Sequence, residues 1–232
     1  MAAVARLPAF FLEWRRYRRL SNESSVALRD LYPCLTDRTE STPFDPHYFF
    51  QSAWLARKLA CRHVPLHVDA GSSVTMLAVM SAHVPTVFLD YRPLAVSLPD
   101  MFPVAGTLSS LPFADQSLAS VSSLHVVEHV GLGRYGDPLN ARGSRDAMSE
   151  LVRVVAPGGR LYLSVPVGRE RVCFNAQRIF AGRTVIEWAQ PLRLLEFALV
   201  DDAGAFHPAT DLSRAEGLAY GCGLFEFERS ND

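Results

Sequence analysis

The chain has 232 residues, of which 49% are hydrophobic and 20% charged, and its net charge is −1. This composition excludes a disordered or fibrous protein and provides enough apolar side chains for a full core. The near balance of 23 basic and 24 acidic residues argues against a general nucleic-acid binder, which would carry a basic excess. No apolar run approaches the roughly 20 residues of a membrane span, and no signal peptide is recognisable, so we expect a cytoplasmic protein.

Four cysteines are spread widely along the chain, at Cys34, Cys61, Cys173 and Cys222. They form no pair or Cys/His cluster with the spacing of a zinc site. We therefore expect free, buried thiols in a reducing compartment, and no metal site. Cys222 has no nearby partner in the sequence that would activate it as a nucleophile.

The first 64 residues differ from the rest and are predicted to form an N-terminal helical cap. Residues 7–20 fit a helix with aromatic side chains on one face and arginines on the other. Such a basic amphipathic helix either packs on its own domain or contacts a membrane surface or a partner protein. Three prolines favour a loop over residues 32–46, and a second helix is predicted over residues 47–62.

Residues 65–232 are predicted to form an α/β domain, because short apolar runs alternate with helical stretches. Helices are expected over residues 74–83 and 144–155. Two late strands with little helix between them indicate a closing hairpin. The predicted strands cover residues 66–68, 86–89, 101–105, 118–124, 160–165, 192–200 and 218–227.

Polar residues follow the predicted strands one after another. Asp69 comes after the first strand and Asp90 after the second, and LPFAD and HVVEH follow the third and fourth. Ligands of doubly wound sheets bind outside the carboxyl ends of the strands, where the strand order reverses. These residues are therefore the first candidates for a binding site.

This ordered set, over about residues 65–167, resembles the class I S-adenosylmethionine-dependent methyltransferases. The resemblance implies a Rossmann-like, mostly parallel seven-stranded sheet whose last strand is reversed. It implies S-adenosylmethionine as cofactor, with Asp90, which lies 21 residues after Asp69, on the ribose hydroxyls. The cofactor-binding residues that it implies are Asp69, Gly71, Ser73, Asp90, Tyr91 and Leu111.

The sequence departs from that family at three places, one of which is Leu118-Ala119 in place of the Phe-Asp that precedes the fourth strand. Ser73 and Thr75 stand where the later glycines of the first loop are expected, and Thr107 stands where an acid often contacts adenine. Side chains in the first loop would crowd a cofactor, because glycine allows a closer backbone approach. A non-catalytic, methyltransferase-like binding or scaffold protein is therefore the alternative. A dinucleotide-dependent nucleotide-sugar enzyme is disfavoured without a full G-x-G-x-x-G motif.

Nearly the whole chain is also similar to a methyltransferase-like family of unknown function. The similar segments are HVVEHVGLGRYGDP, VPVGRERVCFNAQRIF and YGCGLFEF. Some relatives belong with the synthesis of cell-surface polysaccharides. This resemblance implies a small-molecule substrate, a sugar or a glycan precursor, which would be methylated on oxygen.

Three titratable residues after the fourth strand are candidates for catalysis. Methylation of a hydroxyl group requires removal of a proton, usually by His, Asp or Glu. We expect His129 to be the base, Glu128 to orient it, and His125 to lie nearer the cofactor. The same three residues could form a metal site, but their spacing alone is weak evidence. The structural alternative is that both histidines bond to the backbone beneath a loop.

Two further segments are predicted to bind substrate. The glycine-rich loop after the cluster contains Arg134, Tyr135 and Asp137, which suit a phosphate, a carboxylate or sugar hydroxyls. Asn175 and Arg178 follow the fifth strand, where an acceptor would lie. The structural alternatives are an internal Arg134–Asp137 pair, a helix N-cap at Asn175 and a surface ion pair at Arg178.

Overall fold

The computed structural model describes residues 4–20, 27–92 and 94–231. The chain divides into two compact units, Met1–Phe44 and Asp45–Asp232. This boundary comes earlier in the chain than the predicted one after residue 64. Residues 1–3, 21–26, 93 and 232 of the two predicted domains lie outside the described residues.

The first unit contains η1 (Val4–Arg6), α1 (Leu7–Leu20) and η2 (Leu28–Asp30). Helix α1 coincides with the predicted helix over residues 7–20, and the Arg18 guanidinium lies 5.1 Å from the centre of the Trp14 ring. Contact of this helix with a membrane surface or a partner stays a prediction. Among helices in the described parts of the chain, none has both the length and the apolar character needed to cross a membrane.

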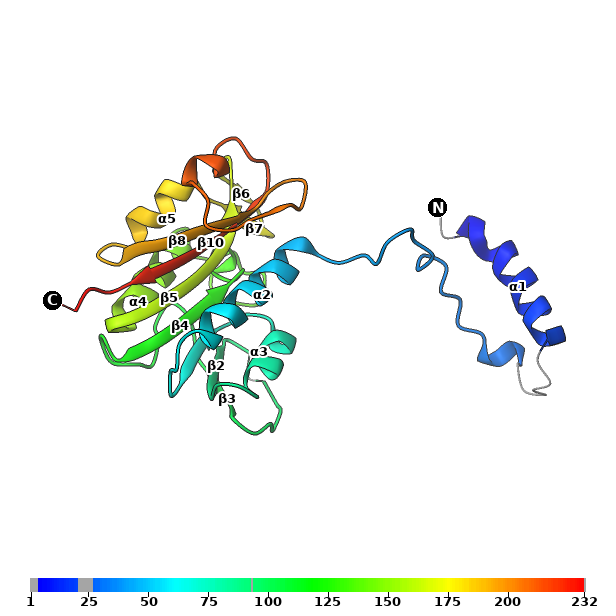
Figure 1. Cartoon of the computed structure of the whole chain (residues 1–232), viewed down its shortest axis with the longest axis horizontal. Coiled ribbons are helices and arrows are strands. Elements are labelled where there is room, and N and C mark those ends of the chain that lie inside the picture. Colours follow the sequence, from blue (N-terminus) through cyan, green and yellow to red (C-terminus); the bar gives the residue numbers. More distant parts are fainter. Residues whose placement is uncertain (1–3, 21–26, 93, 232) are drawn as a thin grey trace. The chain divides into compact units, whose positions relative to one another are not determined.

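The second unit is built on an eight-stranded sheet with the order β3-β2-β1-β4-β5-β10-β8-β9 (Figure 1). Strands β1 to β5 are parallel, whereas β10 is antiparallel to both β5 and β8. The bounds are β1 (His67–Ala70), β2 (Thr86–Asp90), β3 (Met101–Ala105), β4 (Leu118–Leu124), β5 (Val155–Val167), β8 (Arg193–Val200), β9 (Phe206–His207) and β10 (Gly221–Glu228). The predicted α/β fold with a reversed last strand is confirmed, and the two-residue strand β9 is added at one edge.

Helices cover both faces of this sheet (Figure 1). Helices α2 (Pro46–Ala60) and α3 (Val74–Met80) pack on one face, and α4 (Gly143–Val154) and α5 (Gly182–Trp188) pack on the other. Alternate residues of β5 point to opposite faces of the sheet. Tyr162 packs in the core beneath α2 and α3, whereas Leu161 and Leu163 pack in the core beneath α4 and α5. The central strands are therefore buried on both faces.

Helix α2 belongs to the sheet and not to the N-terminal segment with which it was predicted. Its residues Trp54, Leu55 and Leu59 are buried against the sheet. Trp54 Nε1 and Lys58 Nζ also donate hydrogen bonds of 3.1 and 2.7 Å to the Glu196 carboxylate on β8. These contacts explain why the boundary falls before α2.

A small hairpin of β6 (Arg171–Cys173) and β7 (Gln177–Ile179) follows β5. Two short 3₁₀ helices, η3 (Val127–His129) after β4 and η4 (Leu212–Ala215) before β10, complete the unit. The alternative of a helix N-cap at Asn175 is wrong, because Asn175 lies in the turn of this hairpin.

Candidate functional site

A cavity of about 110 Å³ lies beyond the carboxyl ends of the parallel strands. Its walls come from the segments after β1, β2, β3 and β4, and β1 pairs with both β2 and β4. Ligands of open α/β sheets bind at this reversal of strand order. Seven predicted site residues line the cavity: Gly71, Asp90, Tyr91, His125, His129, Tyr135 and Asp137. Arg92, Thr107, Leu108, Val126 and Val130 line it too and were not among the predicted residues.

Gly71 brings the loop after β1 close to the segment after β4. Its φ is +81°, and a Cβ atom here would lie 2.8 Å from Cγ1 of Val126. Both the backbone angle and this close approach require glycine. A ligand in the cavity would therefore meet main-chain atoms at this point.

Asp69 does not line the cavity, in contrast to the prediction. Its carboxylate is fully buried and accepts hydrogen bonds from the backbone N–H and hydroxyl of Ser72 and from the Ser122 hydroxyl. Burial raises the pKa of Asp69 to about 6, against the lowering effect of these hydrogen bonds. Asp69 therefore shapes the loop after β1 from beneath.

Ser73 and Leu111 also lie outside the cavity lining. Ser73 is the N-cap residue of α3, although its side chain makes no capping hydrogen bond. Leu111 is buried in the core beside α4, and its backbone N–H donates to the Glu150 carboxylate at 2.7 Å. Neither residue therefore lies where it would make the predicted contact with a cofactor bound in the cavity.

Asp90 ends β2 at the cavity, and its immediate neighbours form the rim. Asp90 Oδ1 accepts a 2.7 Å hydrogen bond from the backbone N–H of Arg92 and lies 3.6 Å from Arg92 Nε. The Arg92 guanidinium also lies 4.6 Å from the centre of the Tyr135 ring. This cation–π contact joins the segment after β2 to the glycine-rich loop after η3.

His129 is oriented by a main-chain carbonyl. Its Nδ1 lies 2.6 Å from the Ala176 carbonyl oxygen, which can only accept, so Nδ1 carries the proton. Burial lowers the pKa of His129, and the nearby cations Arg134 and His125 act in the same direction against Glu128. The neutral imidazole therefore has its free electron pair on Nε2, as a general base requires.

Glu128 orients His125 and not His129, which corrects the predicted assignment. Glu128 Oε1 lies 2.8 Å from Nδ1 of His125 but 3.7 Å from Nε2 of His129. Burial lowers the pKa of His125, whereas Cys222 and the Glu128 carboxylate raise it. The two raising effects together are larger than the effect of burial, so the pKa of His125 lies above its usual value. His125 is also one of the few non-glycine residues with a positive φ, at 55°.

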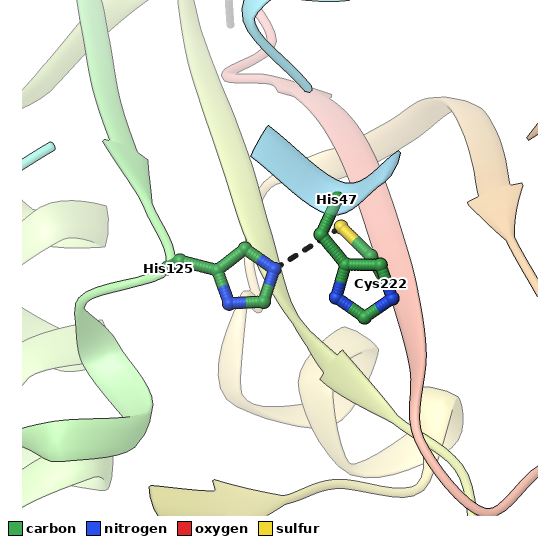
Figure 2. A group of neighbouring side chains, drawn as sticks. All are labelled: His47, His125 and Cys222. Atoms are coloured by element: carbon green, nitrogen blue, oxygen red, sulfur yellow. Dashed lines mark hydrogen bonds between the residues drawn. The ribbon is translucent and has the colours of Figure 1, made fainter. Parts of the chain in front are cut away.

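His125 has several partners far away in the sequence. Two of them are shown in Figure 2, and the Tyr48 ring also stacks on His125 with 5.7 Å between ring centres. Its Nε2 lies 3.3 Å from Sγ of Cys222 on β10, and the His47 ring stacks on it with 5.4 Å between ring centres. The register of β10 against β5 and the start of α2 create this group. No spacing within the sequence signals it.

Arg134 and Asp137 do not form the internal pair that was the structural alternative. Arg134 NH1 donates to the Ala176 carbonyl at 3.1 Å. Asp137 lines the cavity, but Oδ2 accepts from the backbone N–H of Gly131 at 2.7 Å and Oδ1 from that of Tyr135 at 3.3 Å. Asp137 therefore fixes its own loop.

Arg178 is a positioning residue and not the predicted substrate ligand. Its guanidinium is buried and donates to the segment between β4 and α4 and to the first turn of α4. The acceptors are the Val130 carbonyl at 2.6 Å, the Ser144 hydroxyl at 2.9 Å and the Asn140 carbonyl at 3.2 Å. The alternative of a surface ion pair is also wrong. Asn175, by contrast, is exposed at the tip of the hairpin.

The cysteines are all free, but only one is buried as predicted. Cys222 is buried and Cys173 half-buried, whereas Cys34 and Cys61 are exposed. The prediction of buried thiols is therefore wrong for the two exposed residues.

A family model described as a Caenorhabditis protein of unknown function, DUF268, matches residues 108–187. The predicted resemblance to a family of unknown function is thus confirmed over about a third of the chain. No curated protein sequence matches the chain.

Solved structures match over most of the chain. N-methyltransferase NodS from Bradyrhizobium japonicum, with bound S-adenosylhomocysteine, is 16% identical with a TM-score of 0.54 and covers 78% of this chain and 86% of its own. A TehB-like methyltransferase from Corynebacterium glutamicum is 13% identical with a TM-score of 0.51, covering 97% and 99%. The fold is that of the class I methyltransferases. The [4+2]-cyclase SpnF shares it, at 11% identity and a TM-score of 0.57, covering 78% and 81%.

Replacement of Asp69 by Asn is expected to change how stability depends on pH. Folding raises the pKa of Asp69 from 3.8 to about 6, so the carboxyl group loses its proton more easily in the unfolded state. Rising pH therefore lowers the free energy of unfolding. Between pH 4 and pH 7 the wild type should lose on the order of 3 kcal/mol of unfolding free energy relative to Asp69→Asn. Urea unfolding of both proteins across this range measures the difference, and a constant difference would contradict it.

Replacement of Arg178 by Gln is expected to loosen the segment between β4 and α4. Hydrogen bonds to a charged group contribute about 1.5–3 kcal/mol each, and the change removes several. Hydrogen exchange of amides in residues 128–143 should accelerate, and the free energy of unfolding should fall by about 2 kcal/mol or more. Arg145→Gln, an exposed position on α4, is the control and should change neither.

Proposed function

We propose that this protein is an S-adenosylmethionine-dependent methyltransferase that acts on an oxygen atom of a small polar molecule, a sugar or a glycan precursor. The observation that carries the proposal is the position of Asp90 and His129 on one cavity at the reversal of strand order. An acid that suits the ribose and a base that suits the acceptor thus face the same space.

The cavity residues fit parts of the cofactor. Asp90 would accept hydrogen bonds from the ribose hydroxyls. Among the described residues, the side-chain contacts of Asp90 with Arg92 involve Oδ1, so Oδ2 can accept from the ligand. Gly71 would allow close approach of the methionine part. Thr107 offers a hydroxyl at the place of the adenine-binding acid. The cavity is smaller than the ~300–1,000 Å³ of typical ligand pockets, so only part of the cofactor would be enclosed.

His129 would supply the base. Bound cofactor supplies an electrophilic methyl group on a sulfonium. Asp90 and Gly71 would hold this cofactor, which would give up its methyl group to the acceptor oxygen and leave as a neutral thioether that keeps the electron pair of the broken carbon–sulfur bond. The hydroxyl proton goes to His129 Nε2, while the Ala176 carbonyl holds Nδ1–H and fixes the ring.

The acceptor is proposed from the chemistry of the rim and from the family resemblance. Arg92 and Tyr135 present a cationic and an aromatic surface beside His129, whose ring lies edge-on to Tyr135 at 5.7 Å between centres. Aromatic faces and fixed hydrogen-bond donors suit a polyol or an anionic sugar. A place in polysaccharide synthesis rests on the resemblance of the sequence alone.

A non-catalytic, ligand-binding protein is the second candidate, and one observation favours it. Ser73 and Thr75 stand where the later glycines of the first loop are expected, and the acid of that loop, Asp69, is fully buried. SpnF, a cyclase with this fold, also illustrates that the fold alone does not define methyl transfer. Calorimetric titration with S-adenosylmethionine and S-adenosylhomocysteine separates the candidates, because lack of binding would refute the proposed enzyme.

Replacement of Asp90 by Ala is expected to weaken S-adenosylhomocysteine binding roughly tenfold to a hundredfold, since it removes hydrogen bonds to a charged acceptor. Calorimetry measures the change. Asp115→Ala is the matched control, because Asp115 is exposed and lies outside the cavity lining. Equal affinity of the Asp90 variant and the wild type would remove Asp90 from the ribose site.

Replacement of His129 by Gln is expected to leave cofactor affinity unchanged and to lower turnover about 10²–10⁴-fold, the usual contribution of a general base. A screen of sugars and glycan precursors with radiolabelled cofactor would first identify the acceptor. Turnover of His129→Gln is then compared on that acceptor. Full activity of the variant would exclude His129 as the base.

A further inference from the structure

Three potential metal ligands converge beside the cavity, outside the proposed cofactor contacts. His47, His125 and Cys222 each offer one ligand atom, and these atoms all lie within 4.8 Å of one another. They come from the start of α2, the residue after β4 and the second residue of β10 (Figure 2). Among the residues in the described ranges, no other group of three or more such ligands was found.

We propose that His47, His125 and Cys222 bind one Zn²⁺ ion. A thiolate and two imidazoles form a mixed sulfur and nitrogen set that suits this borderline-soft cation. Three protein ligands leave a fourth tetrahedral position for water or for an atom of a bound molecule. The ion would join α2 to the sheet at the edge of the cavity, because His125 lines that cavity as well.

The spacing of the His125 and Cys222 ligand atoms already matches that around a bound ion. Zinc–sulfur bonds of about 2.3 Å and zinc–nitrogen bonds of about 2.0 Å put sulfur and nitrogen roughly 3.5 Å apart in a tetrahedron. Nε2 of His125 and Sγ of Cys222 are 3.3 Å apart. His47 is half-buried and stacks on His125, with only 21° between the ring planes. Because stacked rings do not direct their nitrogens at one point, the His47 ring must turn about its side-chain torsions to bind the ion, and its ligand atom starts within 4.8 Å of the other two.

The other ring nitrogen of His125 has the partner that metal-bound histidines need. Its Nδ1 lies 2.8 Å from Oε1 of the fully buried Glu128. A carboxylate in this position fixes the tautomer, so that Nε2 presents its electron pair to the metal. Glu128 Oε2 has no hydrogen-bond partner in the described part of the chain.

The charges also favour a cation. A buried carboxylate is unfavourable unless a positive charge compensates it. A Zn²⁺ ion would balance both the Glu128 carboxylate and the thiolate of Cys222. The positive φ of His125 is consistent with a functional demand, since such strain persists at sites where the surroundings impose it.

A nucleophilic role for Cys222 is less well supported. The order Cys222–His125–Glu128 resembles an activated thiol with an oriented base. Cys222, however, is 0% exposed, and a carbon atom of a substrate cannot reach a sulfur that is fully covered. A metal ion needs only the space between the three ligand atoms.

Titration of the chelator-stripped full chain with Co²⁺, an optical substitute for zinc, tests the proposal. We expect one equivalent to bind with a thiolate-to-cobalt charge-transfer band, and Zn²⁺ to displace it. The band should disappear in Cys222→Ser and should be retained in Cys61→Ser, the exposed cysteine at the end of α2. In Glu128→Gln the affinity should fall about 10–100-fold. None of these measurements involves the cofactor, so they stand apart from the proposed methyl transfer.

Several results would overturn the proposal. These are a wild type that binds no metal, a charge-transfer band that survives Cys222→Ser, and a band lost in Cys61→Ser. Circular dichroism monitors the fold of each variant. If Cys222→Ser does not fold, His47→Gln decides the question, because His47 is only half-buried and its replacement disturbs the core less. It should bind Co²⁺ roughly tenfold more weakly or worse, and unchanged affinity would exclude the site.

Discussion

The parallel pairing of β1 with both β2 and β4 is the constraint on which the candidate site depends. Because the chain leaves β1 towards one side and β4 towards the other, their loops diverge and leave a space at the carboxyl edge. Gly71 allows the loop after β1 to approach Val126, and both residues line this space. The segments after β2 and β3 and the glycine-rich loop supply the remaining walls.

Two carboxyl groups are buried near the candidate site. Asp69 and Glu128 are both fully buried, yet they stand in different environments. Asp69 is surrounded by neutral hydroxyl and amide donors, which stabilise a loop. Glu128 faces two imidazoles, which can change their charge or bind a metal. Asp69 therefore stabilises the loop after β1, whereas Glu128 orients a titratable side chain of the candidate site.

The sequence predicted those features that depend on local pattern. Strands β3 and β4 have the predicted bounds, because apolar runs of that length between turn signals specify a buried strand. Asp90 ends β2 and His129 lies in the short helix η3 that follows β4, so both reach the cavity at the carboxyl edge of the sheet. The partners of those residues could not be predicted. The Cys222–His125 contact depends on the register of β10 against β5, and Arg178 reaches its acceptors only through the β6–β7 hairpin.

The hydrogen bond between His129 and the Ala176 carbonyl has a consequence for how this site can evolve. Ala176 acts through its carbonyl oxygen, which every amino acid possesses. The side chain at this position is exposed, so mutation can replace it freely while the hydrogen bond persists. An alignment of relatives would then mark position 176 as variable and overlook it. Conservation would instead be expected in the lengths of β6, β7 and their turn, because a one-residue insertion would move the carbonyl away from the imidazole.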